Sequence, residues 1–180
     1  NSSGYDGQPA WSPDQSQIAF TAYRNQQWRI WAMNPDGSGL LQLNNQPYSE
    51  NPVYSTDGSK LVFDTDLDSD GSMEICVISA AGSGDYCTFV YNPSPNLDAL
   101  PRGFSPDKNT VAFTLAAWIN LGNGDYAYTN SYLKSLDIYN GRETSLESSG
   151  LDWNPDWQTN DLLPPQSRVS PLPLYSRAGP

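Results

Sequence analysis

Short apolar runs separated by turn-forming residues recur along this chain of 180 residues. Three segments share one order: an aromatic residue, a tight turn rich in Pro, Asp or Gly, and a run of three apolar residues. The aromatic residues are Trp11, Tyr54 and Phe104, and they recur roughly every 45 residues, a spacing typical of repeat architectures. Short apolar runs bounded by such turns are typical of β-strands.

The rest of each repeat also follows one order. After a hairpin loop comes another apolar strand, residues 29–33 in the first repeat and 74–78 in the second, and a Gly-rich turn leads to the last strand. In the third repeat the pair Asn140-Gly141, a strong hairpin signal, replaces that turn. No window shows helical periodicity, and four short antiparallel strands in roughly 45 residues are typical of one β-propeller blade.

The predicted fold class is therefore all-β. We expect a propeller-repeat domain over residues 1–160, made of three four-stranded antiparallel blades and the first strand of a fourth. An ordinary β-sandwich is the alternative. The predicted blades span residues 8–44, 51–91 and 100–147, and the partial blade spans residues 152–158.

Two segments depart from the repeat. Residues 116–132 form a long insertion in the third copy. Residues 161–180 are rich in Pro, which disfavours a helix or a central strand, so we expect an extended C-terminal arm. The arm is either a solvated linker or a docking segment that uses its apolar side chains: Val169, Leu172, Leu174 and Tyr175.

The repeats resemble a known family in their motifs. The segments PAWSPDQSQIAF, IWAMNPDGSG and NPVYSTDGSKLVF are similar to the TolB-type propeller repeat, over roughly residues 6–158. The resemblance implies a β-propeller that acts as an adaptor, a sensor or a non-catalytic domain. Three blades and one strand cannot close a ring of about four to eight blades. We therefore expect that copies pair, that the chain is part of a longer propeller, or that its tail or a neighbour caps the arc.

Composition narrows the range of partners and activities that this chain can have. The net charge of −11 argues against nucleic acid and anionic membranes as partners, and no apolar run approaches the ~20 residues of a membrane-spanning helix. The sequence contains no His, which excludes Ser-His-Asp and Cys-His catalysis and His-ligated zinc. We expect no catalytic residues and no enzyme activity, with a Ca²⁺- and Arg-assisted mechanism left as the alternative.

An acidic motif in the second repeat is the clearest candidate for a metal-binding site. In DTDLDSDGSMEI, carboxylates occupy alternate positions before a Gly that allows a sharp turn. Alternate carboxylates on a turning loop converge on one point, and Ca²⁺ takes about six to eight oxygen ligands. We predict a Ca²⁺ site here, with a plain polar hairpin loop as the alternative. The candidate ligands are Asp66, Asp68, Asp70, the carbonyl of Ser72, and Glu74.

The two cysteines lie around the next turn of the second repeat. If Gly82 sits in that turn, Ile78 faces Asp85 and Cys76 faces Cys87. Residues that face each other across two strands have Cβ atoms near disulfide range. We predict a disulfide between Cys76 and Cys87, with two buried thiols as the alternative.

Aromatic residues in the insertion form the last candidate site. The blade itself does not need them, so they are candidates for a surface that binds sugar or protein, with the core as the alternative. These residues are Trp118, Tyr126, Tyr128 and Tyr132.

Together these features favour a non-enzymatic extracellular propeller module that works by protein–protein contact. We expect it to assemble with copies of itself, or with other propeller blades, into an oligomer or filament. The alternative is a TolB-like periplasmic adaptor or ligand-binding propeller, with carbohydrate as a candidate ligand, that is part of a longer chain. A disulfide implies an oxidising compartment, and the N-glycosylation sequon at Asn1 agrees with a secreted protein.

Overall fold

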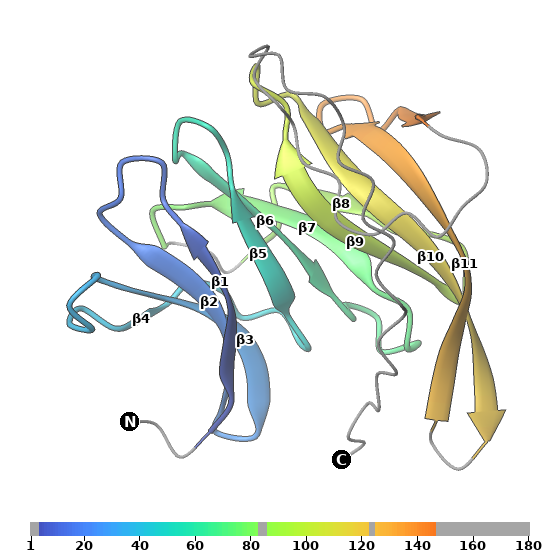
Figure 1. Ribbon diagram of the computed structural model, residues 1–180, viewed down its shortest axis with the longest axis horizontal. Coiled ribbons are helices and arrows are strands. Elements are labelled where there is room, and N and C mark those ends of the chain that lie inside the picture. Colours follow the sequence, from blue (N-terminus) through green and yellow to red (C-terminus); the bar gives the residue numbers. More distant parts are fainter. Residues whose placement is uncertain (1–3, 83–85, 123–124, 147–180) are drawn as a thin grey trace, which may run out of the picture.

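The computed structural model describes residues 4–82, 86–122 and 125–146. These residues form three four-stranded antiparallel sheets, which confirms the predicted all-β fold of propeller blades (Figure 1). The predicted fourth-blade strand at 152–158 and the arm at 161–180 lie outside the described residues. Within the described parts of the chain, no helix has the length and hydropathy of a membrane span.

Each sheet is built from four strands that follow one another in the chain, so each is one blade. Blade 1 contains β1 (Asp6–Trp11), β2 (Ile18–Arg24), β3 (Gln27–Met33) and β4 (Leu41–Gln42). Blade 2 contains β5 (Glu50–Tyr54), β6 (Lys60–Thr65), β7 (Glu74–Ser79) and β8 (Phe89–Tyr91). Blade 3 contains β9 (Leu97–Phe104), β10 (Thr110–Gly122), β11 (Asp125–Asp137) and β12 (Glu143–Ser145).

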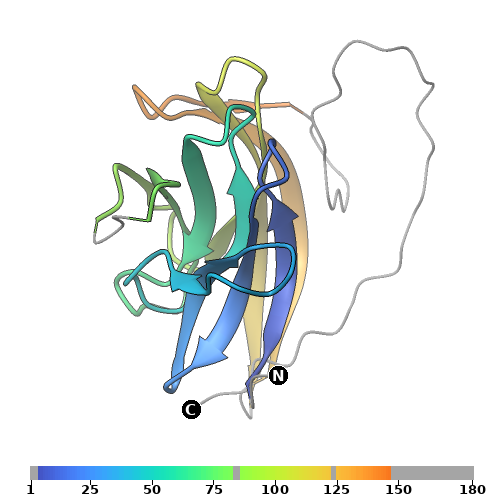
Figure 2. The same ribbon diagram turned by 90° about the vertical axis from the view of Figure 1, so that its left-hand side faces the viewer.

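The three blades stand side by side in chain order, with blade 2 in the middle (Figures 1 and 2). The first strand of each blade contacts the first strand of the next, β1 with β5 and β5 with β9. Short loops that join one blade to the next enforce this order. The row is the radial arrangement of a propeller, with the first strands on its inner side.

Apolar layers fill the two spaces between blades. Leu61 and Phe63 of β6 are fully buried in the layer shared with blade 1, together with Ile30. Val62, between them in sequence, is buried in the layer shared with blade 3, together with Phe113. Alternate residues of a strand point to opposite faces, so the uninterrupted apolar run of β6 reflects a strand that is buried on both faces. Full burial of each such side chain contributes about 1.5–3 kcal/mol.

One turn recurs between the first two strands of every blade. The Ser hydroxyl donates to the carboxylate of an Asp two residues later, and its oxygen accepts the N–H of the residue that leads into the second strand. The same carboxylate accepts an N–H two residues further on. This closed set of bonds explains why the turn chemistry repeats in the sequence. The pairs are Ser12 and Asp14, Ser55 and Asp57, and Ser105 and Asp107.

A bulge also recurs in every blade, where the first strand pairs with the second. Gln8 and Asn51 occupy it with positive φ, 52° and 51°, and the third bulge contains Arg102. Each of these side chains bonds the second strand of its own blade, and Gln8 also accepts the N–H of Asn51 across the blade boundary (3.1 Å). The bulges therefore fix both the register within a blade and the offset between two blades. The pairs are Gln8 with Thr21, Asn51 with Asp64, and Arg102 with Thr114.

The predicted insertion lengthens a hairpin rather than adding a separate element. β10 and β11 contain 13 residues each, and their outer halves project beyond the blade (Figure 1). β9 pairs with β10 only as far as Ala117, so the projecting part is a ribbon of two described strands.

The repeated turn predicts an acid-sensitive contribution to stability. Lys108 and then the hydrogen bonds of the turn hold the pKa of Asp57 well below its ordinary value. A carboxylate with a lowered pKa stabilises the folded state above about pH 4, and this stabilisation is lost as the pH falls further. We expect Asp57→Asn to lower the free energy of unfolding at pH 7, and the gap to wild type to close towards about pH 2. Urea denaturation over this pH range measures both effects.

Lys108→Gln is the matched variant, because it removes the largest cause of the lowered pKa and leaves the serine bonds in place. It should reproduce part of the pH dependence of Asp57→Asn, because the hydrogen bonds of Ser55 and Ser59 still lower the pKa of Asp57. Thr56→Ala, at the adjacent exposed position, should show the same difference from wild type at every pH. A gap for Asp57→Asn that does not change with pH would contradict the prediction.

Candidate metal site

The acidic motif forms the loop between β6 and β7 in blade 2. Asp66, Asp68 and Glu74 each place one carboxylate oxygen within 4.8 Å of the other two, which is close enough to share one cation. Asp70 is not in this group; its Oδ1 accepts the N–H of Ser72 at 2.7 Å. The structure thus brings together three of the five predicted ligand residues, with two of the carboxylates buried and Asp68 exposed.

Turn geometry holds the loop in this shape. The Oδ1 of Asp66 accepts the N–H of Gly71, and the Oδ1 of Asp68 accepts the N–H of Asp70, both at 3.3 Å. Gly71 has φ 89°, a conformation that glycine adopts without strain. Ser69 also has positive φ, 63°. The chain therefore reverses sharply between Asp68 and Gly71 and returns the carboxylates to one side.

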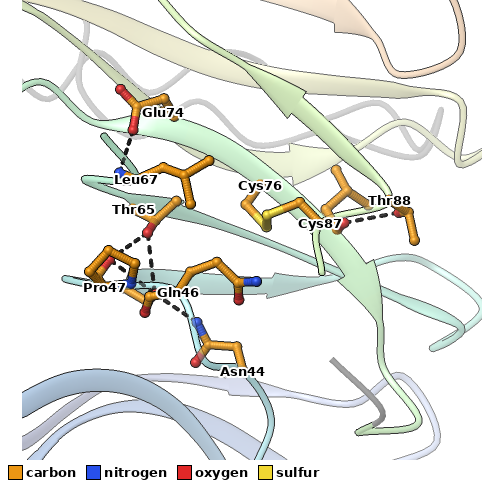
Figure 3. The surroundings of a disulfide bond; sticks show 11 residues. Asn44, Gln46, Pro47, Thr65, Leu67, Glu74, Cys76, Cys87 and Thr88 are labelled. Carbon is orange, nitrogen blue, oxygen red and sulfur yellow. Dashed lines mark hydrogen bonds between the residues drawn. A yellow bond between two sulfur atoms is a disulfide. The ribbon is translucent and has the colours of Figure 1, made fainter. Parts of the chain in front are cut away.

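Glu74 begins β7 and is the most deeply buried member of the group, with no exposed surface. Its Oε2 accepts the N–H of Leu67 at 2.6 Å (Figure 3). Its Oε1 is buried and has no hydrogen-bond partner. Burial, with a smaller contribution from the charges of the three aspartates, raises the pKa of Glu74 to about 7, although the bond from the N–H of Leu67 lowers it.

The same loop is fastened to blade 3. The N–H of Met73 donates to Oδ1 of Asp98 (3.0 Å), and the carbonyl of Met73 accepts the N–H of Ala99 (2.8 Å). The hydroxyl of Ser72 accepts the N–H of Asn96 at 3.1 Å. Because Asp98 is 2% exposed, these bonds form inside the boundary between the two blades.

Sequence reasoning missed Asp98 and a second buried acid, Asp64. Asp64 is 1% exposed, and burial together with the charge of Glu50 raises its pKa to about 7. Asn51 and Arg102 counteract this rise. The aspartate spacing around residues 66–70 signalled the loop, but no local pattern marked either buried acid, because their partners lie on other strands.

The arrangement suits a hard cation. It offers carboxylate oxygens and no imidazole or free thiol, since the chain contains no His and the two cysteines are bonded to each other. Oxygen-only ligand sets of this kind select Ca²⁺ or Mg²⁺ over transition metals.

The predicted disulfide is present. Cys76 and Cys87 are bonded, with their Cα atoms 5.5 Å apart (Figure 3). The predicted register was wrong, because Cys76 faces Val90 rather than Cys87 in the ladder of β7 and β8. Cys87 reaches Cys76 from just before β8, where the N–H of Thr88 donates to the carbonyl of Val77 at 2.7 Å. The short β8 leaves a longer connection between the two strands than the predicted Gly-rich turn.

Among the insertion aromatics whose side chains the structure describes, Tyr132 lies apart from Trp118 and Tyr128. Trp118 pairs with Tyr128 across the β10–β11 ribbon, and both are half-buried. The Tyr128 hydroxyl donates to Oδ2 of Asp98 (2.7 Å), which ties the ribbon to the acidic loop. Tyr132 is 40% exposed and pairs with Leu115. The side chain of Tyr126, like the residues Asn1, Val169, Leu172, Leu174 and Tyr175, lies outside the described residues.

No family model matches this sequence. The Tol-Pal system protein TolB from Anaeromyxobacter dehalogenans is 36% identical over 77 residues, which span 42% of this chain and 17% of that protein. Two solved structures share the fold over most of this chain. A putative TolB from Agrobacterium tumefaciens has a TM-score of 0.59 at 21% identity and covers 82% of this chain and 50% of its own. TolB from Acinetobacter baumannii has a TM-score of 0.60 at 23% identity, over 83% of this chain and 34% of its own.

The three sheets are therefore blades of a β-propeller. Over 77 residues their repeats are similar in sequence to those of TolB, in agreement with the motifs of the sequence. More distant structures of the same fold include an oligogalacturonate lyase (13% identity) and a Nidogen/Laminin complex (11%), so the fold occurs in proteins of different function.

The disulfide predicts a measurable contribution to stability. The two cysteines are 11 residues apart. A bond that closes a loop of this length lowers the conformational entropy of the unfolded chain and stabilises the folded state by about 2–3 kcal/mol. We expect reduction of the native protein, which removes the bond and keeps both side chains, to lower the free energy of unfolding by that amount. The double variant Cys76→Ala/Cys87→Ala should be similarly destabilised and insensitive to reductant. Two titratable thiols in unfolded, unreduced protein would contradict the bond.

Proposed function

We propose that this chain is a non-enzymatic interaction module: a set of TolB-type blades that packs against further blades and, once completed, binds a protein partner outside the cytoplasm. The proposal rests mainly on the outer face of blade 1, which is apolar and which no described sheet covers. The absence of His and the Cys76–Cys87 disulfide support the non-catalytic and extracytoplasmic parts.

The outer face of blade 1 has the composition of a buried face. Ala19 and Ile30 point into the layer shared with blade 2, so their neighbours along β2 and β3 point away from it. The register aligns these neighbours in pairs, and the Arg24 guanidinium lies 4.9 Å from the Trp31 ring. Blade 1 stands at one end of the row, where no described sheet covers this face (Figure 1). The outward apolar residues are the exposed Trp11, the half-buried Ile18, Trp31 and Met33, and Phe20, which is 5% exposed.

Another blade fits this face best, and we propose that a second copy supplies it. The Trp11 side chain is 55% exposed, although aromatic rings of this size contribute strongly when they are buried at an interface. The matched region covers half of the Agrobacterium TolB chain, so two copies of this region contain about as many residues as that chain. A ring closed by two identical arcs also leaves no exposed blade face.

A second candidate function follows from the small share of the curated relative's length that this chain matches. The curated relative is matched over only 17% of its length, which favours a TolB-like periplasmic adaptor or ligand-binding propeller whose remaining blades belong to the same longer chain. In that case the outer face of blade 1 meets a blade of its own polypeptide. Carbohydrate is then a candidate ligand alongside protein.

The mass of the chain in solution distinguishes these candidates. We expect light scattering coupled to size exclusion to report a mass above that of one 19.8 kDa chain, rising with concentration. Trp11→Glu should return the protein to the mass of one chain, because a charge buried in an apolar interface costs a few kcal/mol. Tyr139→Glu is the matched control, since Tyr139 is 71% exposed on the turn between β11 and β12.

Three outcomes are informative. A single-chain mass at every concentration, with intact β-sheet circular dichroism, would contradict self-assembly and favour the longer-chain candidate. An assembly that persists in Trp11→Glu would move the interface away from blade 1. A chain ending at residue 160 tests the Pro-rich arm: loss of assembly would assign the contact to residues 161–180.

A further inference from the structure

Glu74 presents an unusual arrangement inside the acidic group. The residue has no exposed surface, and its Oε1 has no hydrogen-bond partner, yet it lies among the carboxylates of Asp66 and Asp68. A buried acceptor without a partner costs about 1–3 kcal/mol, and neighbouring like charges add to this cost. A bound cation removes both penalties, because it binds the free oxygen and neutralises the group.

We propose that Asp66, Asp68 and Glu74 bind one Ca²⁺ ion, and that this ion fastens blade 2 to blade 3. The proposal is independent of whether copies assemble, since all three ligands come from one loop of one chain. It has a natural order of binding. Asp68 is exposed and meets the ion first, and the two buried carboxylates complete the site.

Ca²⁺ fits this loop better than Mg²⁺ does. Mg²⁺ requires nearly ideal octahedral geometry and usually keeps several waters, whereas Ca²⁺ accepts irregular sets of carboxylate and carbonyl oxygens. The carboxylates of the loop are held by different turns and lie at different depths, which suits irregular geometry. A net charge of −11 also raises the local concentration of divalent cations.

The contacts of the loop explain how the ion would act on the blade boundary. The Oδ2 of Asp68 accepts the side-chain N–H of Asn92, in the connection from blade 2 to blade 3 (3.3 Å). The residues between the ligands carry the bonds of Ser72 to Asn96 and of Met73 to Asp98. An ion that orders both ends of the loop therefore orders these bonds as well.

The ribbon provides a spectroscopic probe of the site. The indole ring of Trp118 lies 4.0 Å from the position that a Cβ atom would take on Gly71, in the middle of the loop. Tb³⁺ replaces Ca²⁺ in oxygen sites and emits when a nearby indole transfers energy to it. We expect the full chain to show Tb³⁺ emission excited through tryptophan, and Ca²⁺ to displace it.

Matched variants identify the ligands. Asp68→Asn should weaken Ca²⁺ binding in calorimetry by at least about tenfold, and because Asp68 is exposed the variant should fold as wild type. Glu74→Gln keeps the shape of the buried side chain and should also abolish tight binding. Asp36→Asn, an exposed carboxylate in a turn of blade 1, should bind as wild type. Trp118→Phe should lose most of the Tb³⁺ emission while calorimetry shows unchanged Ca²⁺ affinity.

Hydrogen exchange tests the effect on the blade boundary. With Ca²⁺ at a hundredfold excess over Kd, linkage increases the folding equilibrium constant about a hundredfold. The amides of Met73, Asn96 and Ala99, which lie outside residues 66–72, should also exchange more slowly when Ca²⁺ is bound. Asp68→Asn should remove this added protection. Protection confined to residues 66–72 would overturn the fastening role. Absence of Ca²⁺ binding by calorimetry and of tryptophan-sensitised Tb³⁺ emission would overturn the site.

Discussion

Packing of blade 2 against both of its neighbours is the interaction on which the other features depend. β6 and β7 bury side chains on both faces, so neither neighbour can slide along them without exposing an apolar row. That fixed position brings the acidic loop against Asp98 of blade 3 and holds Cys76 at a fully buried site. Each local feature is therefore defined by contacts on either side of the middle sheet.

The sequence was most informative where bonds are local. The Ser–Asp turn closes within six residues, so its chemistry repeats visibly and predicts where strands begin. The bulges were not foreseen, because Gln8 and Asn51 take partners on a neighbouring strand and across a blade boundary. The disulfide was predicted correctly from a wrong register, since a strand as short as β8 leaves little pattern to fix its pairing.

The candidate site shows the same division. Alternate carboxylates predicted a converging loop, and two of them, Asp66 and Asp68, do converge, together with Glu74. The burial of Glu74 and the role of Asp98 depend on blade 3, which no motif near residue 66 describes. The aromatic cluster was treated as one surface, whereas the cross-strand register pairs Trp118 with Tyr128 beside the loop and places Tyr132 elsewhere. Contacts between blades thus decide which residues of a motif cooperate.

The connection between the second and third strands differs in every blade. In blade 1 it is a tight turn at Asn25 and Gln26, in blade 2 it is the acidic loop, and in blade 3 it is the projecting ribbon. The connection between the first and second strands keeps one Ser–Asp turn throughout. Equivalent hairpins of successive blades open at the same rim of a propeller. The Ser–Asp turns thus repeat as a constant part of the scaffold, while the connections at the opposite rim change in length without disturbing the packing of the blades.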